Sequence, residues 1–342
     1  MPVAKGLIKF LGLLLVLALA AAALGTWWVR SPLPTGSAAL DLSIEPGTSP
    51  RGIAQQVVDA GAATSPTLLY AWFRVSGQSR LMRAGSYEIA PGTSPQRLLA
   101  MLVRGEESLR SLTIVEGWNW RQVRQALAKA ELLKPDSRSL SDEALMAQLG
   151  RPGVAPEGRF YPDTYSYAKG SSDLKLLARA LKAMDKQLDK AWAARASGIA
   201  LQSPEQALIL ASIVEKETGR GGDRPMIASV FHNRLRIGMP LQTDPTVIYG
   251  LGEAFDGNLK RIHLRSDTPW NTYTRTGLPP TPIAMPGKAA LLAAVQPASS
   301  RALYFVAKGD GSSQFSETLD AHNRAVNRYQ RGQGGFPGQS GE

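Results

Sequence analysis

Two neighbouring glutamates, Glu215 and Glu217, end a run of apolar residues and are the side chains best suited to acid–base chemistry. Positions 207–214 are apolar apart from Ser212, which predicts a helix that is buried on nearly every side. Residues two positions apart on a helix differ by about 200° in direction, so the two glutamates cannot share a face. Glu217 continues the row that contains Leu210, and we expect it to point toward the interior or a cleft.

A carboxyl in such a place has its charged form disfavoured by loss of solvent, which raises its pKa. A raised pKa is what a general acid needs at neutral pH. In the alternative interpretation the helix end reaches solvent, and Glu215, Lys216 and Glu217 form an ordinary charge cluster. Spacing alone decides neither between these interpretations nor between the two glutamates.

The limits of this helix are marked in the sequence. Ser203 is expected as the N-cap, Pro204 as the first helical residue and Gln206 as the partner that completes a capping box. Gly219 is expected to end the helix.

Polar segments downstream of the glutamates have the composition of a cleft wall, and they cover residues 231–235, 241–250, 268–273 and 276–280. They combine amides, hydroxyls and aromatic rings, which suit a sugar through stacking and neutral hydrogen bonds. The same Gly, Pro, Asn and Tyr residues also suit simple turns. Each segment is weak by itself, but together with a glutamate on a buried helix they indicate carbohydrate chemistry.

The composition excludes several kinds of site. The chain has 342 residues, enough for two folded units, and a net charge of +11 without a dense Lys/Arg run, which argues against a nucleic-acid partner. It has no cysteine, which excludes disulfides, thiolate catalysis and Cys-ligated zinc. The histidines, His232, His263 and His322, lie far apart, so we expect no metal site and no cofactor.

The N-terminal segment predicts where the rest of the chain works. Residues 10–29 are uncharged and end in Trp27-Trp28, and a helix of this length spans about 30 Å, the thickness of a bilayer core. Lys5 and Lys9 precede it and Arg30 follows, which favours a cytoplasmic N-terminus with everything after residue 30 outside. The alternative is a cleaved signal peptide, because Ala18-Leu19-Ala20 resembles a cleavage site.

An internal repeat follows the N-terminal segment. Residues 44–50 and 89–95 both read Ile-x-Pro-Gly-Thr-Ser-Pro, and a looser copy lies at 114–120. Each copy predicts the end of a strand, a turn at Gly and a helix, with Ser49 and Ser94 as N-caps. Such units resemble the LysM module, a small glycan-binding fold, although a repeated packing unit without a ligand would look the same.

Five segments carry a resemblance to a known family and occur in that family's order. They are residues 157–164, 211–218, 233–250, 273–280 and 303–307. The first reads Glu-Gly-Arg-Phe-Tyr-Pro-Asp-Thr, and the second reads Ala-Ser-Ile-Val-Glu-Lys-Glu-Thr. They closely resemble the endolytic murein transglycosylase family, also called YceG-like, and the likeness covers nearly the whole chain after residue 40. By the family's motif the second glutamate of Glu-Lys-Glu, Glu217, is the catalytic one.

The resemblance implies an α+β fold with a single N-terminal transmembrane helix, a small LysM-like α/β subdomain and a larger mixed α+β catalytic domain. The expected boundaries are a cytoplasmic N-terminus at 1–9, the transmembrane helix at 10–29, a linker at 30–39, the LysM-like subdomain at 40–110, the catalytic domain at 111–330 and a disordered tail at 331–342. The expected location is the cell inner membrane, crossed once, with the catalytic domain in the periplasm.

The activity that the resemblance implies is cleavage of the bond between N-acetylmuramic acid and N-acetylglucosamine, leaving 1,6-anhydro ends. Gln242, Asn271 and Tyr273 are candidates for holding the sugar and its N-acetyl group, and Asp244 is a candidate second carboxylate in what is also a plain Thr-Asp-Pro turn. The expected partners are peptidoglycan glycan strands, the inner membrane through the N-terminal helix, and the synthases that make the strands.

Two other functions fit the same residues. A non-catalytic, membrane-tethered glycan-binding scaffold of the cell-wall machinery would use the LysM-like units without cutting. A muramidase that uses water would leave reducing ends instead of anhydro ends.

Overall fold

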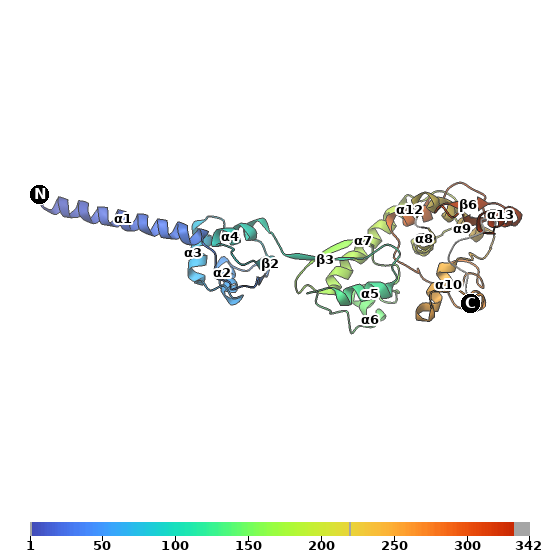
Figure 1. The fold of residues 1–342 in the computed structure, drawn as a ribbon, viewed down its shortest axis with the longest axis horizontal. Helices are drawn as coiled ribbons and strands as arrows, with labels where there is room; N and C mark the ends of the chain where they lie inside the picture. Colours follow the sequence, from blue (N-terminus) through green and yellow to red (C-terminus); the bar gives the residue numbers. More distant parts are fainter. Residues whose placement is uncertain (1, 219, 332–342) are drawn as a thin grey trace. The chain divides into compact units, whose positions relative to one another are not determined.

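The computed structural model describes residues 2–218 and 220–331 (Figure 1). It divides into two compact units. Residues up to 110 form the first unit together with 166–170, which come from much later in the chain. Residues 111–165 and those from 171 onward form the second unit.

The first unit begins with the helix α1 (Pro2–Arg30). Among the described residues it is the one helix long and apolar enough to cross a membrane, over Lys9–Arg30. The sequence prediction of an N-terminal apolar helix is confirmed in that respect.

The rest of the first unit has the order strand, helix, helix, strand, helix. β1 (Leu40–Ile44) pairs antiparallel with β2 (Gly85–Ile89), and α2 (Pro50–Asp59) and α3 (Pro66–Val75) lie between them in the chain. α4 (Pro95–Arg104) follows β2. Each helix begins at a serine N-cap followed by proline, which fixes the entry of the chain into the helix. The core is apolar and includes Val57, Leu69, Phe73, Tyr87 and Leu98.

The predicted strand–turn–helix repeat is present at all three places. β1 and α2 form the first copy, β2 and α4 the second, and β3 (Leu109–Thr113) with α5 (Trp120–Lys129) the third. The turn glycine has φ of +86° at Gly47, +87° at Gly92 and +78° at Gly117, a conformation that other residues rarely adopt. The third helix begins with a capping box between Asn119 and Gln122.

β3 pairs with β4 (Thr164–Ala168) in a two-stranded sheet. In the second unit α6 (Asp142–Gln148) and the long amphipathic α7 (Asp173–Ala193) flank β4 in sequence. Then follow α8 (Pro204–Glu217), η1 (Gly221–Asp223), α9 (Arg224–Arg236), α10 (Asp244–Leu251), η2 (Gly252–Ala254), α11 (Arg261–Arg265) and α12 (Lys288–Val295). The antiparallel pair β5 (Tyr304–Ala307) and β6 (Ser313–Ser316), α13 (Leu319–Val326) and the π-helical turn η3 (Asn327–Arg331) end the described chain. The mixed α+β prediction is confirmed.

α8 is the central helix of the second unit. All eight residues from 207 to 214 are buried, and the helix contacts α7, α9, α10 and α12. Ser203 caps the helix as predicted. The predicted capping box is wrong, because the side chain of Gln206 accepts from the N–H of Gln202 rather than from that of Ser203.

The helix ends at Glu217, and Thr218 is extended. The predicted stop, Gly219, lies outside the described residues, and so do residues 332–342 of the predicted tail.

Candidate active site

Glu217 is the last residue of α8 and is partly buried. Its Oε1 accepts a hydrogen bond from the Thr243 hydroxyl, just before α10. Burial raises the pKa of Glu217 above its usual value. The hydrogen bond from Thr243 and the charge of Arg234 oppose this rise in pKa, and the charge of Asp244 adds to it.

Glu215 has different surroundings. Its side chain is 5% exposed and forms an ion pair with Arg224 at 3.1 Å. Its other oxygen, Oε2, accepts from the N–H of Gly287 at 2.7 Å. Both carboxylate oxygens are therefore held by the protein, and Glu215 ties α8 to α9 and to the start of α12.

A threonine network fixes the residues that face Glu217. The N–H of Thr243 donates to the Thr272 hydroxyl at 3.1 Å, and the hydroxyls of Thr246 and Thr272 lie 2.8 Å apart. The N–H of Gln242 donates to the carbonyl of Thr272 at 3.0 Å. The segments around 243 and 272 are thus fastened together, although 29 residues separate Thr243 from Thr272 in the chain.

Gln242 has an unusual backbone. Its φ is +49°, in the left-handed region that non-glycine residues seldom occupy, and its side chain is exposed. Such conformations persist where the surrounding structure enforces them, and they cluster at functional sites. Here the bond from its own N–H to Thr272 contributes to that constraint.

Asp244 and Tyr273 form a pair beside this network. The Tyr273 hydroxyl donates to Oδ1 of Asp244 at 2.5 Å. Burial, this hydrogen bond and the negative charges of Asp244 and Glu217 together raise the pKa of Tyr273. The phenol therefore keeps its proton at neutral pH and remains a donor.

Arg234 is a site residue that the sequence analysis included only within the segments 231–235 and 233–250, without a role of its own. It is 6% exposed and donates to the carbonyls of Leu303 and Leu241, each at 2.7 Å. Its guanidinium lies 5.4 Å from the centre of the Tyr304 ring. Burial lowers the pKa of Arg234, while its positive charge lowers that of Glu217. Its position on an otherwise apolar helix face was the available signal.

Asn271 lies in a different setting from the one predicted for a sugar-binding residue. It is 0% exposed, and its Nδ2 donates to the carbonyl of Ser266 at 2.7 Å. Its Oδ1 accepts from the N–H of Tyr273 at 2.9 Å. Both ends of the amide are used inside the protein, where they hold the loop that carries Tyr273.

Another buried carboxyl, Glu157, belongs to a separate cluster. Both of its oxygens accept from the N–H of Trp120 at the start of α5, at 3.1 and 3.0 Å, and Tyr249 hydrogen-bonds to it. Burial raises the pKa of Glu157 to about 7. The sequence reasoning included it only as part of the 157–164 motif.

The sequence analysis expected no metal site at the histidines, because they lie far apart in the chain. His232 is buried between the N–H of Ala200, 3.1 Å from Nδ1, and the carbonyl of Ala294, 2.8 Å from Nε2. Within residues 2–218 and 220–331, no group of three or more His, Cys, Asp or Glu side chains is arranged to hold a metal ion.

Comparison with known proteins identifies the family of this chain. The model of the YceG-like family matches residues 42–328. An endolytic murein transglycosylase of Bacillus subtilis is 32% identical over 309 residues, which cover 85% of this chain and 84% of the relative. One from Streptococcus pneumoniae strain D39 is 29% identical over 72% of this chain, and the match spans 50% of that relative's length.

A solved structure agrees with these relatives. The crystal structure of a YceG-like protein from Listeria monocytogenes superposes with a TM-score of 0.53 at 29% identity, over 84% of this chain and 99% of the other. The family match covers well over half of the sequence and includes both the repeat and the Glu-Lys-Glu segment. This chain therefore belongs to the YceG-like family.

Proposed function

We propose that this protein is a membrane-anchored, endolytic lytic transglycosylase that cleaves the glycosidic bond between N-acetylmuramic acid and N-acetylglucosamine in peptidoglycan strands. Glu217 is its general acid and base, and the products carry 1,6-anhydro ends. The observation that carries the proposal is the position of Glu217 at the end of buried α8, hydrogen-bonded by Thr243 and close to Asp244 and Arg234, where burial raises its pKa. Relatives that bear the name endolytic murein transglycosylase support the substrate class.

The reaction needs one group that first gives and then takes a proton. Protonated Glu217 donates to the glycosidic oxygen, the C1–O bond breaks, and the muramic acid ring gains oxocarbenium character. The carboxylate then removes the proton of the C6 hydroxyl of the same sugar, whose oxygen bonds to C1. No water is consumed, and Glu217 ends protonated as it began. The nucleophile is already part of the substrate, so the proximity advantage is large.

The surroundings of Glu217 suit both halves of this cycle. Burial favours the protonated acid, and the charge of Arg234 favours the carboxylate that remains after proton transfer. Because Thr243 donates to Oε1, we place the transferred proton on Oε2. Opposing effects of this kind bring the pKa of an acid closer to the pH at which it works.

We assign sugar contacts to Gln242, Tyr273 and Asp244. Gln242 presents an exposed amide, and the Tyr273 phenol is a proton-bearing donor. The Asp244 carboxylate adds negative charge near the developing oxocarbenium ion. Asn271 acts indirectly, by holding the loop in which Tyr273 lies.

The first unit would bring the enzyme to its substrate. We propose that α1 anchors the chain in the inner membrane over residues 10–29, with residues 1–9 in the cytoplasm and everything after residue 30 in the periplasm. The order strand–helix–helix–strand with antiparallel β1 and β2 supports a LysM-like subdomain at 40–110 that contacts glycan. The domain at 111–330 would carry the chemistry, close to the synthases that make the strands.

The test replaces Glu217 with Gln and measures anhydro-ended fragments released from purified sacculi by mass spectrometry. Loss of the proton donor is expected to reduce their formation by about 100- to 10,000-fold. Gln keeps an oxygen that can accept from Thr243, so the melting temperature is expected to stay equal or to rise.

Glu215→Gln is the matched control. It removes the partner of buried Arg224 and is expected to lower the melting temperature while anhydro ends still form below that temperature. Undiminished anhydro ends from Glu217→Gln would refute the assignment. Reducing ends from the wild type would identify a muramidase, and binding without any cleavage would identify a scaffold.

A further inference from the structure

The helix α3 has apolar residues on two faces. Leu69 and Phe73 point into the core of the first unit and are completely buried. Leu68, Trp72 and Val75 share a different face, at the spacing i, i+4, i+7, and Leu68 is 53% and Val75 83% exposed. A surface helix normally carries polar residues on its outer face, so this stripe indicates a surface that contacts something apolar.

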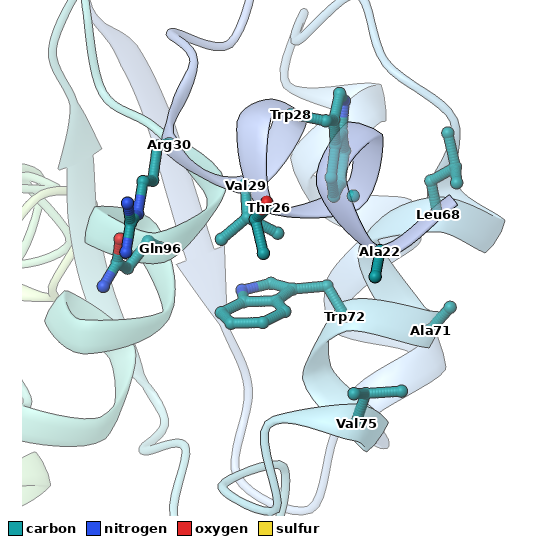
Figure 2. A pocket seen from close by; sticks show the side chains of 11 residues that line it. Ala22, Thr26, Trp28, Val29, Arg30, Leu68, Ala71, Trp72, Val75 and Gln96 are labelled. Atoms are coloured by element: carbon teal, nitrogen blue, oxygen red, sulfur yellow. The ribbon is translucent and has the colours of Figure 1, made fainter. Parts of the chain in front are cut away.

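A groove runs between this stripe and the last turns of α1. Its volume is about 470 Å³, within the range of lipid- and ligand-sized pockets. The wall on the α1 side combines the small residues Ala22, Gly25 and Thr26 with the larger Trp28 and Val29. A Cβ built on Gly25 would meet nothing within 4 Å, so the groove is open at that point. Figure 2 shows the Trp72 ring beneath Thr26 and Val29.

The two ends of the groove differ in polarity. Arg30 and Gln96 lie beside one another at one end, and Ala22, Ala71 and Val75 lie away from them (Figure 2). Arg30 forms no ion pair with a carboxylate of the described part of the chain. The groove is therefore amphipathic, with a free guanidinium at its polar end.

The position of the groove along α1 matches the position of lipids. The apolar part of α1 is Lys9–Arg30, and the groove lies against its last turns, from Ala22 to Arg30. In a bilayer these residues would occupy the outer leaflet and its interface, with Arg30 at headgroup level. The apolar end of the groove then points toward the hydrocarbon and the polar end toward water, as in a phospholipid.

We propose that this groove binds one acyl chain of an anionic phospholipid of the outer leaflet, with Arg30 and Gln96 on the headgroup, and that the exposed stripe of α3 lies in the membrane surface. The proposal rests on α1 spanning the membrane, which is part of the proposed function. It gives the first unit a second attachment to the bilayer besides the anchor.

Depth measurements test the stripe in the full chain reconstituted in lipid nanodiscs. The chain has no cysteine, so Val75→Cys, Arg51→Cys and Val16→Cys each give a single site for a bimane probe. Acyl-brominated lipids are expected to quench the probe at 75 and at 16, and to leave the probe at 51, on the exposed face of α2, unquenched.

The pattern of quenching separates the two proposals. Quenching at 16 but not at 75 would overturn the lipid groove and leave the anchor standing, whereas no quenching at 16 would overturn the anchor and the groove with it. A probe at 75 that is shielded in cell membranes but unquenched in nanodiscs would show that a protein helix occupies the groove.

Lipid retention tests the groove itself. Native mass spectrometry of the full chain with added phosphatidylglycerol is expected to show one retained lipid, and Gly25→Leu is expected to lose it by filling the groove. Gly12→Leu is the matched control, because a Cβ at Gly12 also meets nothing within 4 Å but Gly12 lies outside the groove.

The headgroup contact has its own variant. Arg30→Gln is expected to reduce the preference for phosphatidylglycerol over phosphatidylcholine about fivefold, the effect of one cation near an anionic surface. Equal retention by Gly25→Leu and Gly12→Leu, or an unchanged preference in Arg30→Gln, would overturn the proposal.

Discussion

Glu157 and Glu217 are both acids whose pKa is raised by burial, but their partners differ. Glu217 has a hydroxyl donor, a nearby arginine and a second carboxylate, so its proton affinity is adjusted by several opposing charges. Glu157 is held by a backbone N–H and a phenol. The first arrangement suits a proton that moves, and the second suits a structural acid that joins the start of α5 to α10.

The pH dependence of stability tests whether the pKa of Glu157 is raised in the folded protein. Because the pKa of Glu157 rises from 4.5 to about 7 on folding, the native state holds a proton that the unfolded chain has released. The free energy of unfolding should therefore fall as pH rises from about 4.5 to 7. Glu157→Gln lacks this loss, and above pH 7 it should be more stable than the wild type by on the order of 3 kcal/mol.

Urea denaturation at pH 4.5 and at pH 8 measures the difference. The advantage of Glu157→Gln should be small at the lower pH, where the wild-type acid is protonated in both states. An advantage that is the same at both pH values would show that the pKa of Glu157 is not raised.

At the scale of elements, the helices were more predictable than the loops. The apolar run at 207–214 predicted α8 and its burial, and the Gly-Thr-Ser-Pro turns predicted the starts of α2 and α4. These features depend on neighbours in sequence. Spacing alone did not separate Glu215 from Glu217, and only the family's motif favoured Glu217. The ion pair of Glu215 with Arg224 could not be predicted, because it depends on how α8 and α9 pack.

The hydrogen-bond partners of Arg234 and Asn271 could not be predicted either, because they too depend on the folded chain. The partners of Arg234 include the carbonyl of Leu303, 69 residues away. Asn271 was expected to bind sugar because amides in loops suit neutral hydrogen bonds to a sugar. Its actual partners are loop carbonyls close in sequence, and only the folded loop shows that both ends of the amide are used.

Asn271→Ala tests the role of that loop. Removing a fully buried amide leaves the carbonyl of Ser266 and the N–H of Tyr273 without partners, and the expected cost is about 2–4 kcal/mol. The melting temperature should fall by roughly 5–10 °C, and cleavage should slow because Tyr273 is no longer held.

Thermal unfolding and the rate of fragment release from sacculi measure these two effects. Asn258→Ala, in an exposed loop, is the matched control and should change neither. A normal melting temperature combined with lost cleavage in Asn271→Ala would instead give Asn271 a direct contact with the sugar.

At the scale of the whole molecule, the anchor and the chemistry are expected to be separable. Deleting residues 1–30 removes α1 and leaves β1 and everything after it. The shortened protein should leave the membrane fraction and still cleave isolated sacculi at a rate within about twofold of the full chain in detergent, because Glu217 and its partners all lie in the second unit.

Fractionation after expression and fragment release from sacculi check this prediction. If expression of the full sequence gives soluble protein whose N-terminus has been removed after Ala20, the segment is a cleaved signal peptide instead of an anchor. Loss of cleavage in a folded, shortened protein would mean that α1 contributes to the chemistry.

The first unit also contains residues 166–170, although they are encoded after more than fifty residues of the second unit. Lys169 in this return segment forms an ion pair with Asp41 in β1. The two units are therefore not consecutive in the chain. Anyone who grafts the first unit onto another enzyme, or exchanges it between relatives, must transplant two separated stretches of gene, and a cut at residue 110 alone would leave a piece of it behind.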